Sequence, residues 1–207
     1  MERTSTKQAI LDAALDLFSV RGFEETSVAQ IADAVGIRKA SLYSHFAGKQ
    51  DILDALLRQV QTQYQKHSIF AQSKWNVEAL AQKGRNLTVD SAVAEILSHI
   101  RYILHDPQIS KARRLLMIEQ FRNPALAELQ TKQNYADILR YFTELIGVCI
   151  REGKLLDCDA EMMAAQLCLP ITVWINLCDR EMDREAEVMV LIERHIRQFF
   201  KLYQKPA

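Results

Sequence analysis

The chain has 207 residues with 26 basic and 26 acidic side chains, so its formal net charge is zero and global charge indicates no partner. Six Gly and four Pro are few turn-forming residues for this length, which disfavours a many-stranded β-sandwich or barrel. Hydrophobic residues make up 49% of the chain, which is enough to build a core and excludes general disorder. The apolar runs are shorter than the ~20 residues of a membrane span, and the four cysteines form no CxxC pair. We therefore expect a reduced, soluble, cytoplasmic protein without a membrane partner.

Apolar residues recur at helical spacing along the whole chain, and no segment shows the alternation of a strand. Capping residues, Gly and Pro divide this pattern into expected helices at about 5–21, 27–35, 38–46, 49–61, 88–104, 109–121, 124–152, 159–178 and 184–203. Residues 75–87 are ambiguous and could hold one short helix. The predicted fold class is all-α.

Residues 26–46 indicate two short helices joined by a tight turn at Gly36. This is the arrangement of a helix-turn-helix motif, whose second helix enters the major groove of DNA. From Ala34 to Gln50 the only charged residues are the basic Arg38, Lys39 and Lys49. Because salt screens distant charges, this local positive charge is what a phosphate backbone would meet. The spacing of these residues alone is also compatible with an ordinary corner between two helices that binds no DNA.

Residues 5–50 resemble the DNA-binding domain of the TetR (tetracycline-repressor-like) family of transcriptional regulators. The resemblance rests on Phe18, Gly22-Phe23, Thr26-Ser27-Val28, Ile31-Ala32, Val35-Gly36-Ile37, Leu42-Tyr43, His45-Phe46 and Gly48-Lys49. It implies a three-helix DNA-binding domain at 1–50 and a helical effector-binding and dimerisation domain at 51–207. The function it implies is a repressor that binds a palindromic double-stranded DNA operator as a homodimer and is released by a small-molecule effector. The alternative is a DNA-binding regulator with no small-molecule effector.

The resemblance also assigns DNA-binding roles residue by residue. Lys39, Ala40 and Ser41 match positions that read base edges, and Tyr43 and His45 match backbone contacts. Lys49 matches a phosphate-binding lysine at a helix N-terminus, where free N–H groups already attract anions. The full expected set is Thr26, Ser27, Arg38, Lys39, Ala40, Ser41, Tyr43, Ser44, His45 and Lys49. The family often has a capping residue where this chain has Arg38, so we expect an uncapped recognition helix and an Arg38 side chain that reaches a phosphate or a guanine edge.

The C-terminal part carries no motif of its own, and its site residues are expected from pattern alone. Aromatic, Met and His side chains are candidates for lining an effector pocket: Trp75, His99, Tyr102, His105, Met117, Phe121, Tyr141 and Trp174. The apolar face of the last helix predicts a dimer interface formed by Val188, Leu191, Ile192, Ile196 and Phe199. For each of these residues ordinary core packing is the competing interpretation.

Catalytic and metal-binding patterns are missing from the sequence. It contains no HExxH, no Gly-rich phosphate loop, no GxSxG and no paired CxxC. We therefore expect no enzymatic activity, no cofactor and no metal site.

Overall fold

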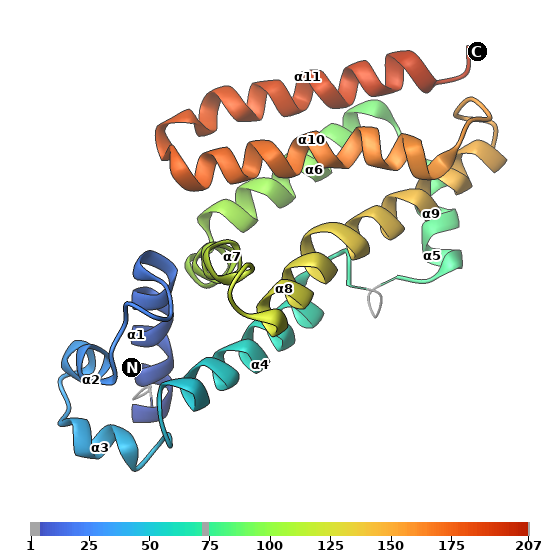
Figure 1. The fold of residues 1–207 in the computed structure, drawn as a ribbon. Helices are drawn as coiled ribbons and strands as arrows, with labels where there is room; N and C mark the ends of the chain where they lie inside the picture. Colours follow the sequence, from blue (N-terminus) through green and yellow to red (C-terminus); the bar gives the residue numbers. More distant parts are fainter. Residues whose placement is uncertain (1–4, 72–74, 207) are drawn as a thin grey trace. The chain divides into compact units, whose positions relative to one another are not determined.

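The computed structural model describes residues 5–71 and 75–206, and its chain divides into two compact units (Figure 1). Unit 1 comprises residues 1–67 and 107–130, and unit 2 comprises residues 68–106 and 131–207. Over the described residues the regular structure is helical, with one isolated bridge between Leu155 and Gln204. The predicted all-α class is therefore confirmed. The predicted domains at 1–50 and 51–207 divide the chain linearly, whereas these units interleave because residues 107–130 join the first.

Unit 1 contains the N-terminal helices and two that follow much later in the chain. Its elements are α1 (Thr6–Arg21), α2 (Val28–Val35), α3 (Lys39–Tyr43), α4 (Lys49–His67), α7 (Pro107–Glu119) and α8 (Pro124–Thr131). They share one core, in which Leu115 and Leu116 of α7 pack with Phe18, Ile31 and Leu42. Helix α1 packs directly against α7, so it buries part of its apolar face against residues that lie some 100 positions further on.

Local capping explains where the first helices begin and end. The predicted capping box at α2 is present, because the Gln30 N–H donates to Ser27 Oγ at 3.2 Å and the Ser27 N–H donates to Gln30 Oε1 at 2.7 Å. At α1 only half of the predicted box forms, since Ser5 accepts from the Gln8 N–H while the Gln8 side chain donates to Asp12. Gly36 ends α2 in the left-handed region at φ +76°, a conformation that a residue with a Cβ rarely adopts.

Unit 2 is a bundle of longer helices. It contains α5 (Val77–Asn86), α6 (Val89–His105), the π-helical turn η2 (Lys132–Ala136), α9 (Asp137–Arg151), α10 (Ala160–Arg180), the 3-10 turn η3 (Met182–Arg184) and α11 (Glu185–Tyr203). Helix α9 packs against α5 and α10, and α11 packs against α6 and α10. The ambiguous stretch at 75–87 forms α5, capped by the Asn76 side chain.

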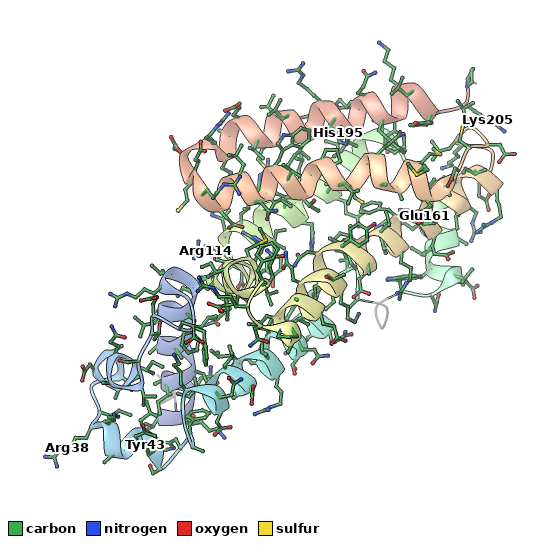
Figure 2. All side chains as sticks on the ribbon, viewed as in Figure 1. Arg38, Tyr43, Arg114, Glu161, His195 and Lys205 are labelled. Carbon is green, nitrogen blue, oxygen red and sulfur yellow. The ribbon has the colours of Figure 1, made fainter. Side chains whose placement is uncertain are left out.

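Helix α10 is the one helix among the described residues that could cross a membrane by length and composition alone. Its uncharged run, residues 162–178, is nevertheless shorter than the ~20 residues of a membrane span, as the sequence predicts. One apolar face of this helix packs in the core of unit 2, where Met163, Leu167 and Ile171 are buried against neighbouring helices. Pro170 lies inside the helix and offers no N–H. One turn earlier, the Leu167 carbonyl accepts a hydrogen bond of 3.0 Å from Nε2 of His195, a residue of α11 (Figure 2).

Gly84 lies where α5 packs closely against α9. A Cβ added at Gly84 would overlap Val148 Cγ1 and would stand 3.3 Å from Val148 Cβ. We expect Gly84→Ala to lower the free energy of unfolding by ~1–3 kcal/mol, because overpacking outweighs the better helix propensity of Ala. Urea denaturation measures this loss. In a Val148→Ala background the same substitution should cost much less, because only the 3.3 Å contact with the Cβ remains. An equal loss in both backgrounds would contradict the packing argument.

Candidate nucleic-acid interface and ligand site

Helix α3 presents almost all of its side chains to solvent. Leu42 and the following Phe46 are buried and fix the helix on the core of unit 1. The remaining predicted DNA-binding residues of this segment are exposed: Arg38, Lys39, Ala40, Ser41, Tyr43, Ser44 and His45. The surface carries two permanent positive charges and no carboxylate of its own. It is thus a free, cationic helix face of the kind that enters a major groove.

Arg38 stands at the N-cap of α3 without a side-chain hydrogen bond to the helix, as the sequence predicts. Its backbone is extended at φ −69° and ψ 144°, and the side chain projects away from the α2–α3 turn (Figure 2). An exposed guanidinium that makes no capping contact is available for a bidentate contact with a phosphate or with guanine O6 and N7.

Thr26 and Ser27, both expected to contact DNA, occupy different environments. Thr26 is buried and its hydroxyl donates to the Gly22 carbonyl at 2.9 Å, so this side chain closes the α1–α2 loop and does not face solvent. Ser27 is exposed and serves as the N-cap of α2. The structure therefore leaves Ser27 and the α2 N-terminus accessible and corrects the expectation for the Thr26 side chain.

Lys49 binds within the chain in this structure. Its Nζ donates to the carbonyls of Phe23 at 2.7 Å and Glu24 at 3.3 Å, and it lies 4.2 Å from the centre of the Phe23 ring. An ammonium group has three N–H donors. Two are used on the α1–α2 loop, which leaves one for a phosphate at the N-terminus of α4.

Glu119 of α7 is a residue that the sequence analysis did not single out. It is buried, and its Oε1 accepts the Phe23 N–H at 2.7 Å. A Cβ on Gly22 would stand only 2.7 Å from the same oxygen, and the φ of this residue is +82°, which together explain why glycine ends α1. Glu119 and Lys49 thus hold the α1–α2 loop from two sides. No local sequence signal reveals a contact between residues 96 positions apart.

Five rings meet in unit 2, and we call Phe70, Trp75, His99, Tyr141 and Phe142 the aromatic cluster. Phe70 lies at its centre, 5.1 Å from the His99 ring, 5.4 Å from Tyr141 and 5.7 Å from Phe142. Trp75 packs edge-on against Tyr141 at 5.8 Å. Three of the predicted ligand-site residues, Trp75, His99 and Tyr141, are therefore brought together here. Phe70 and Phe142 were missed because an isolated Phe in an apolar pattern indicates only a core position.

Polar groups border the aromatic cluster on one side. Lys83 Nζ donates to the Tyr141 hydroxyl at 2.7 Å and forms an ion pair with Glu95. Burial lowers the pKa of Lys83, but the hydrogen bonds to Glu95 and Tyr141 outweigh it and leave that pKa above its ordinary value. Burial raises the pKa of Tyr141 and lowers that of His99. At neutral pH the cluster therefore holds a neutral tyrosine and a neutral imidazole beside a charged lysine–glutamate pair.

The other predicted ligand-site residues lie elsewhere. Trp174 packs edge-on against His195 at 5.4 Å, between α10 and α11. Tyr102 is exposed, and the exposed His105 pairs with Glu185 at 2.9 Å. Met117 and Phe121 belong to unit 1, where Phe121 is 90% exposed. The eight residues do not form one set, because aromatic residues at helical spacing occur in ordinary cores and on surfaces alike.

The predicted dimer-interface residues are mostly internal. Val188, Ile192, Ile196 and Phe199 are buried in the core of unit 2 of a single chain, and Leu191 is half-buried. These residues form the packing face of α11, so they are not a free surface for a second protomer. The large apolar residues that remain exposed on α10 are Met162 and Val173. They are 11 residues, or about three turns, apart and therefore share one face of the helix.

Within the described residues no group of three or more His, Cys, Asp and Glu side chains could hold a metal ion. Cys149, Cys168 and Cys178 are buried and Cys158 is exposed. Burial raises the pKa of the Cys149 thiol, and it raises that of Cys168 to about 11. These two thiols are protonated at neutral pH and behave as small apolar side chains.

Comparison with known proteins agrees with this architecture. Residues 10–56 match the family model described as bacterial regulatory proteins, tetR family, and residues 91–205 match that of the AefR-like transcriptional repressor C-terminal domain. The HTH-type transcriptional regulator SrpR of Pseudomonas putida is 23% identical over 206 residues, which are 99% of this chain and 88% of SrpR. AcrR of Shigella flexneri is 32% identical over 116 residues, 56% of this chain and 48% of AcrR.

Solved structures share the fold. The SmeT–triclosan complex superposes with a TM-score of 0.61 at 18% identity, covering 99% of this chain and 94% of that one. A regulator from Saccharomonospora viridis in complex with choline gives a TM-score of 0.60 at 17% identity, and the match covers 97% of this chain and 98% of that one.

Proposed function

Because the chain belongs to the TetR family of bacterial transcriptional regulators, we propose that it is a repressor that binds a palindromic operator as a homodimer and dissociates when unit 2 takes up a small molecule. It is a DNA-binding regulator and not an enzyme. The observation that carries the proposal is the exposed, acid-free face of α3, held on a buried Leu42.

A homodimer supplies the specificity that one α3 lacks. A five-residue helix reaches only a few base pairs, whereas two copies spaced ~34–36 Å apart read successive major grooves of a palindrome. The exposed Met162 and Val173 on one face of α10 support an interface on this helix. Burial of such side chains against a second copy would remove them from water.

The aromatic cluster supports the effector part of the proposal. It combines apolar rings with a few polar groups, which is the usual make-up of a small-molecule site. The fold is compatible with such ligands, since the SmeT structure contains triclosan and the Saccharomonospora viridis structure contains choline. Helix α4 joins the two units along the chain and is the natural element to transmit a change.

The energy that the mechanism requires is modest. Changing the ratio of DNA-competent to DNA-incompetent dimers from 99:1 to 1:99 requires that the effector bind the incompetent state ~5.5 kcal/mol more tightly. Two effector molecules, one per protomer, would supply this at ~2.7 kcal/mol each.

Selection of bound sequences from random DNA, followed by fluorescence anisotropy, tests the proposal. We expect an inverted repeat, bound by two protomers. A thermal-shift screen of metabolites and drugs should then find compounds that raise the melting temperature and release the operator. Operator binding without any such compound would favour the alternative, a regulator with no effector. Failure to bind any duplex at low salt would exclude both.

Arg38→Ala tests the contact proposed for the uncapped start of α3. We expect the operator affinity to fall about tenfold or more, since the change removes one charged contact from each protomer. The salt dependence of binding distinguishes the two targets of Arg38. If Arg38 contacts a phosphate, its loss reduces the slope of log K against log salt concentration by about one per protomer. If it contacts a guanine, its loss relaxes the sequence specificity at one base pair. An affinity within twofold of the unmodified protein at every salt concentration would refute the contact.

A further inference from the structure

The π-helical turn η2 changes which residues share a face of the helix that contains α8 and α9. The Asp137 N–H donates to the Lys132 carbonyl, an i→i−5 bond that adds one residue to this turn. In a regular α-helix, residues 133 and 141 would stand about 80° apart around the axis. The added residue takes back about 100°, which leaves them about 20° apart. The turn therefore places Gln133 on the face of Tyr141.

Burial along the chain agrees with this register. Positions 133, 137, 141 and 145 are buried, whereas 131, 135, 140 and 144 are exposed. Three consecutive buried positions on this face are polar, and we call Gln133, Asp137 and Tyr141 the polar stripe. Its Tyr141 end belongs to the aromatic cluster. A buried polar row in an otherwise apolar bundle needs partners, because unpaired polar groups destabilise a core.

Two members of the polar stripe have partners, and the amide nitrogen of the third has none in the described part of the chain. Asp137 pairs with Lys132 at 2.6 Å, and Tyr141 accepts from Lys83. Gln133 is 7% exposed, and its Nε2 has no acceptor among the residues that the structure describes. A buried amide with two N–H donors and no acceptor is uncommon in native structures and calls for an explanation. Its position in a π turn, a feature frequent at functional sites, points in the same direction.

We propose that the Gln133 carboxamide is the hydrogen-bond donor that holds an oxygen of the effector, with the effector's apolar part toward the aromatic cluster. This inference rests on the proposed function, in which unit 2 takes up a small molecule. The ligand class is an uncharged, largely aromatic compound that carries a carbonyl or hydroxyl oxygen.

Charge selects this class over ionic ones. The Asp137 carboxylate follows Gln133 by one turn and is already paired with Lys132 at 2.6 Å, with Arg140 4.0 Å away, so these charges are occupied with one another. A cationic ligand would leave both Gln133 donors without an acceptor. On the other side of the stripe, Lys83 and Glu95 already neutralise each other, and burial lowers the pKa of His99 so that it is neutral at pH 7. No unbalanced charge among these groups favours an ion.

The test compares ketones with hydrocarbons of the same shape on the full-length protein. The probe pairs are acetophenone with α-methylstyrene, 2-acetylnaphthalene with 2-isopropenylnaphthalene, and benzophenone with 1,1-diphenylethylene. In each pair C=O becomes C=CH2, so only the acceptor is lost. The affinity is measured by calorimetry and by quenching of tryptophan fluorescence. Gln133→Leu removes the donor at similar volume, and Gln198→Leu, on an exposed position of α11, is the matched control.

We expect the protein and the Gln198→Leu variant to bind at least one ketone about tenfold more tightly than its hydrocarbon partner. Gln133→Leu should bind both members of that pair equally, and its melting temperature without ligand should be unchanged or higher, because a buried unpaired donor has been removed. The proposal is overturned if Gln133→Leu still binds the ketone more tightly than its hydrocarbon partner, or if the unmodified protein prefers the ketone in none of the three pairs. Operator binding by the same samples is measured separately. A sample that binds the operator but shows no ketone preference contradicts only the role of Gln133, whereas a protein that binds no operator contradicts the proposed function.

Discussion

Ile192→Glu is expected to unfold unit 2 and not to produce a folded monomer. Ile192 is 0% exposed in the core that α11 forms with α6 and α10. The substitution removes apolar burial and places a carboxylate where no partner exists, which costs ~4 kcal/mol or more. That loss is comparable to the whole stability of a typical domain, about 5–15 kcal/mol. Circular dichroism should show loss of helix or a melting temperature far below that of the unmodified protein.

Val173→Glu tests the proposed interface on α10 and is the matched control for Ile192→Glu. Val173 is 62% exposed on α10, so a carboxylate there stays in water in a single chain. We expect a normal helical spectrum, a monomer in sedimentation velocity, and loss of operator affinity because one α3 cannot read both half-sites. An intact dimer would move the interface away from this face of α10, and a native melting curve for Ile192→Glu would contradict its assignment to the core.

Ala40→Glu is expected to weaken operator binding about 100-fold while leaving the fold intact. Ala40 is exposed at the second position of α3, where a carboxylate suits the helix dipole and disturbs no packing. In a complex the same carboxylate would face the negative field of DNA phosphates. A penalty of about tenfold per protomer gives roughly a 100-fold loss for the dimer. Fluorescence anisotropy measures the affinity.

The same substitution at Ala94, an exposed position of α6 in unit 2, controls for added negative charge. Ala94→Glu should bind the operator almost as the unmodified protein does at moderate salt. If Ala40→Glu and Ala94→Glu weaken binding equally, the effect is one of total charge and the face of α3 is not the reading surface.

The fold was largely predictable because its helices have local start and stop signals. The Ser27–Gln30 box, Thr88 before α6 and Asp159 before α10 each act as caps, as their sequence context indicates. The π turn η2 was not predictable, since residues 132–136 contain neither Gly nor Pro and the expected helix 124–152 continues through them. The recognition helix is shorter than expected, Lys39–Tyr43 in place of 38–46.

The candidate sites were predictable only where a local motif specifies them. The surface of α3 follows from spacing within 21 residues, and the structure leaves it exposed. The face of α11 was also recognised as buried, but helical periodicity cannot say whether a face packs within one chain or between two. Ile192 and Ile196 pack within the chain. The partners of Lys49, Glu119 and Gln133 depend on contacts or register that no short window of sequence contains.

The discontinuous make-up of unit 1 has a consequence for synthesis. Leu115, Leu116 and Leu126 belong to the core on which α1 to α3 rest, and Glu119 closes the loop after α1. A nascent chain that stops short of residue 130 lacks this support, although its helix-turn-helix segment is complete. Folding from the N-terminus, which is the usual order during translation, must here wait until well over half of the polypeptide has left the ribosome. A premature stop would thus yield an unstable fragment and not a small constitutive repressor.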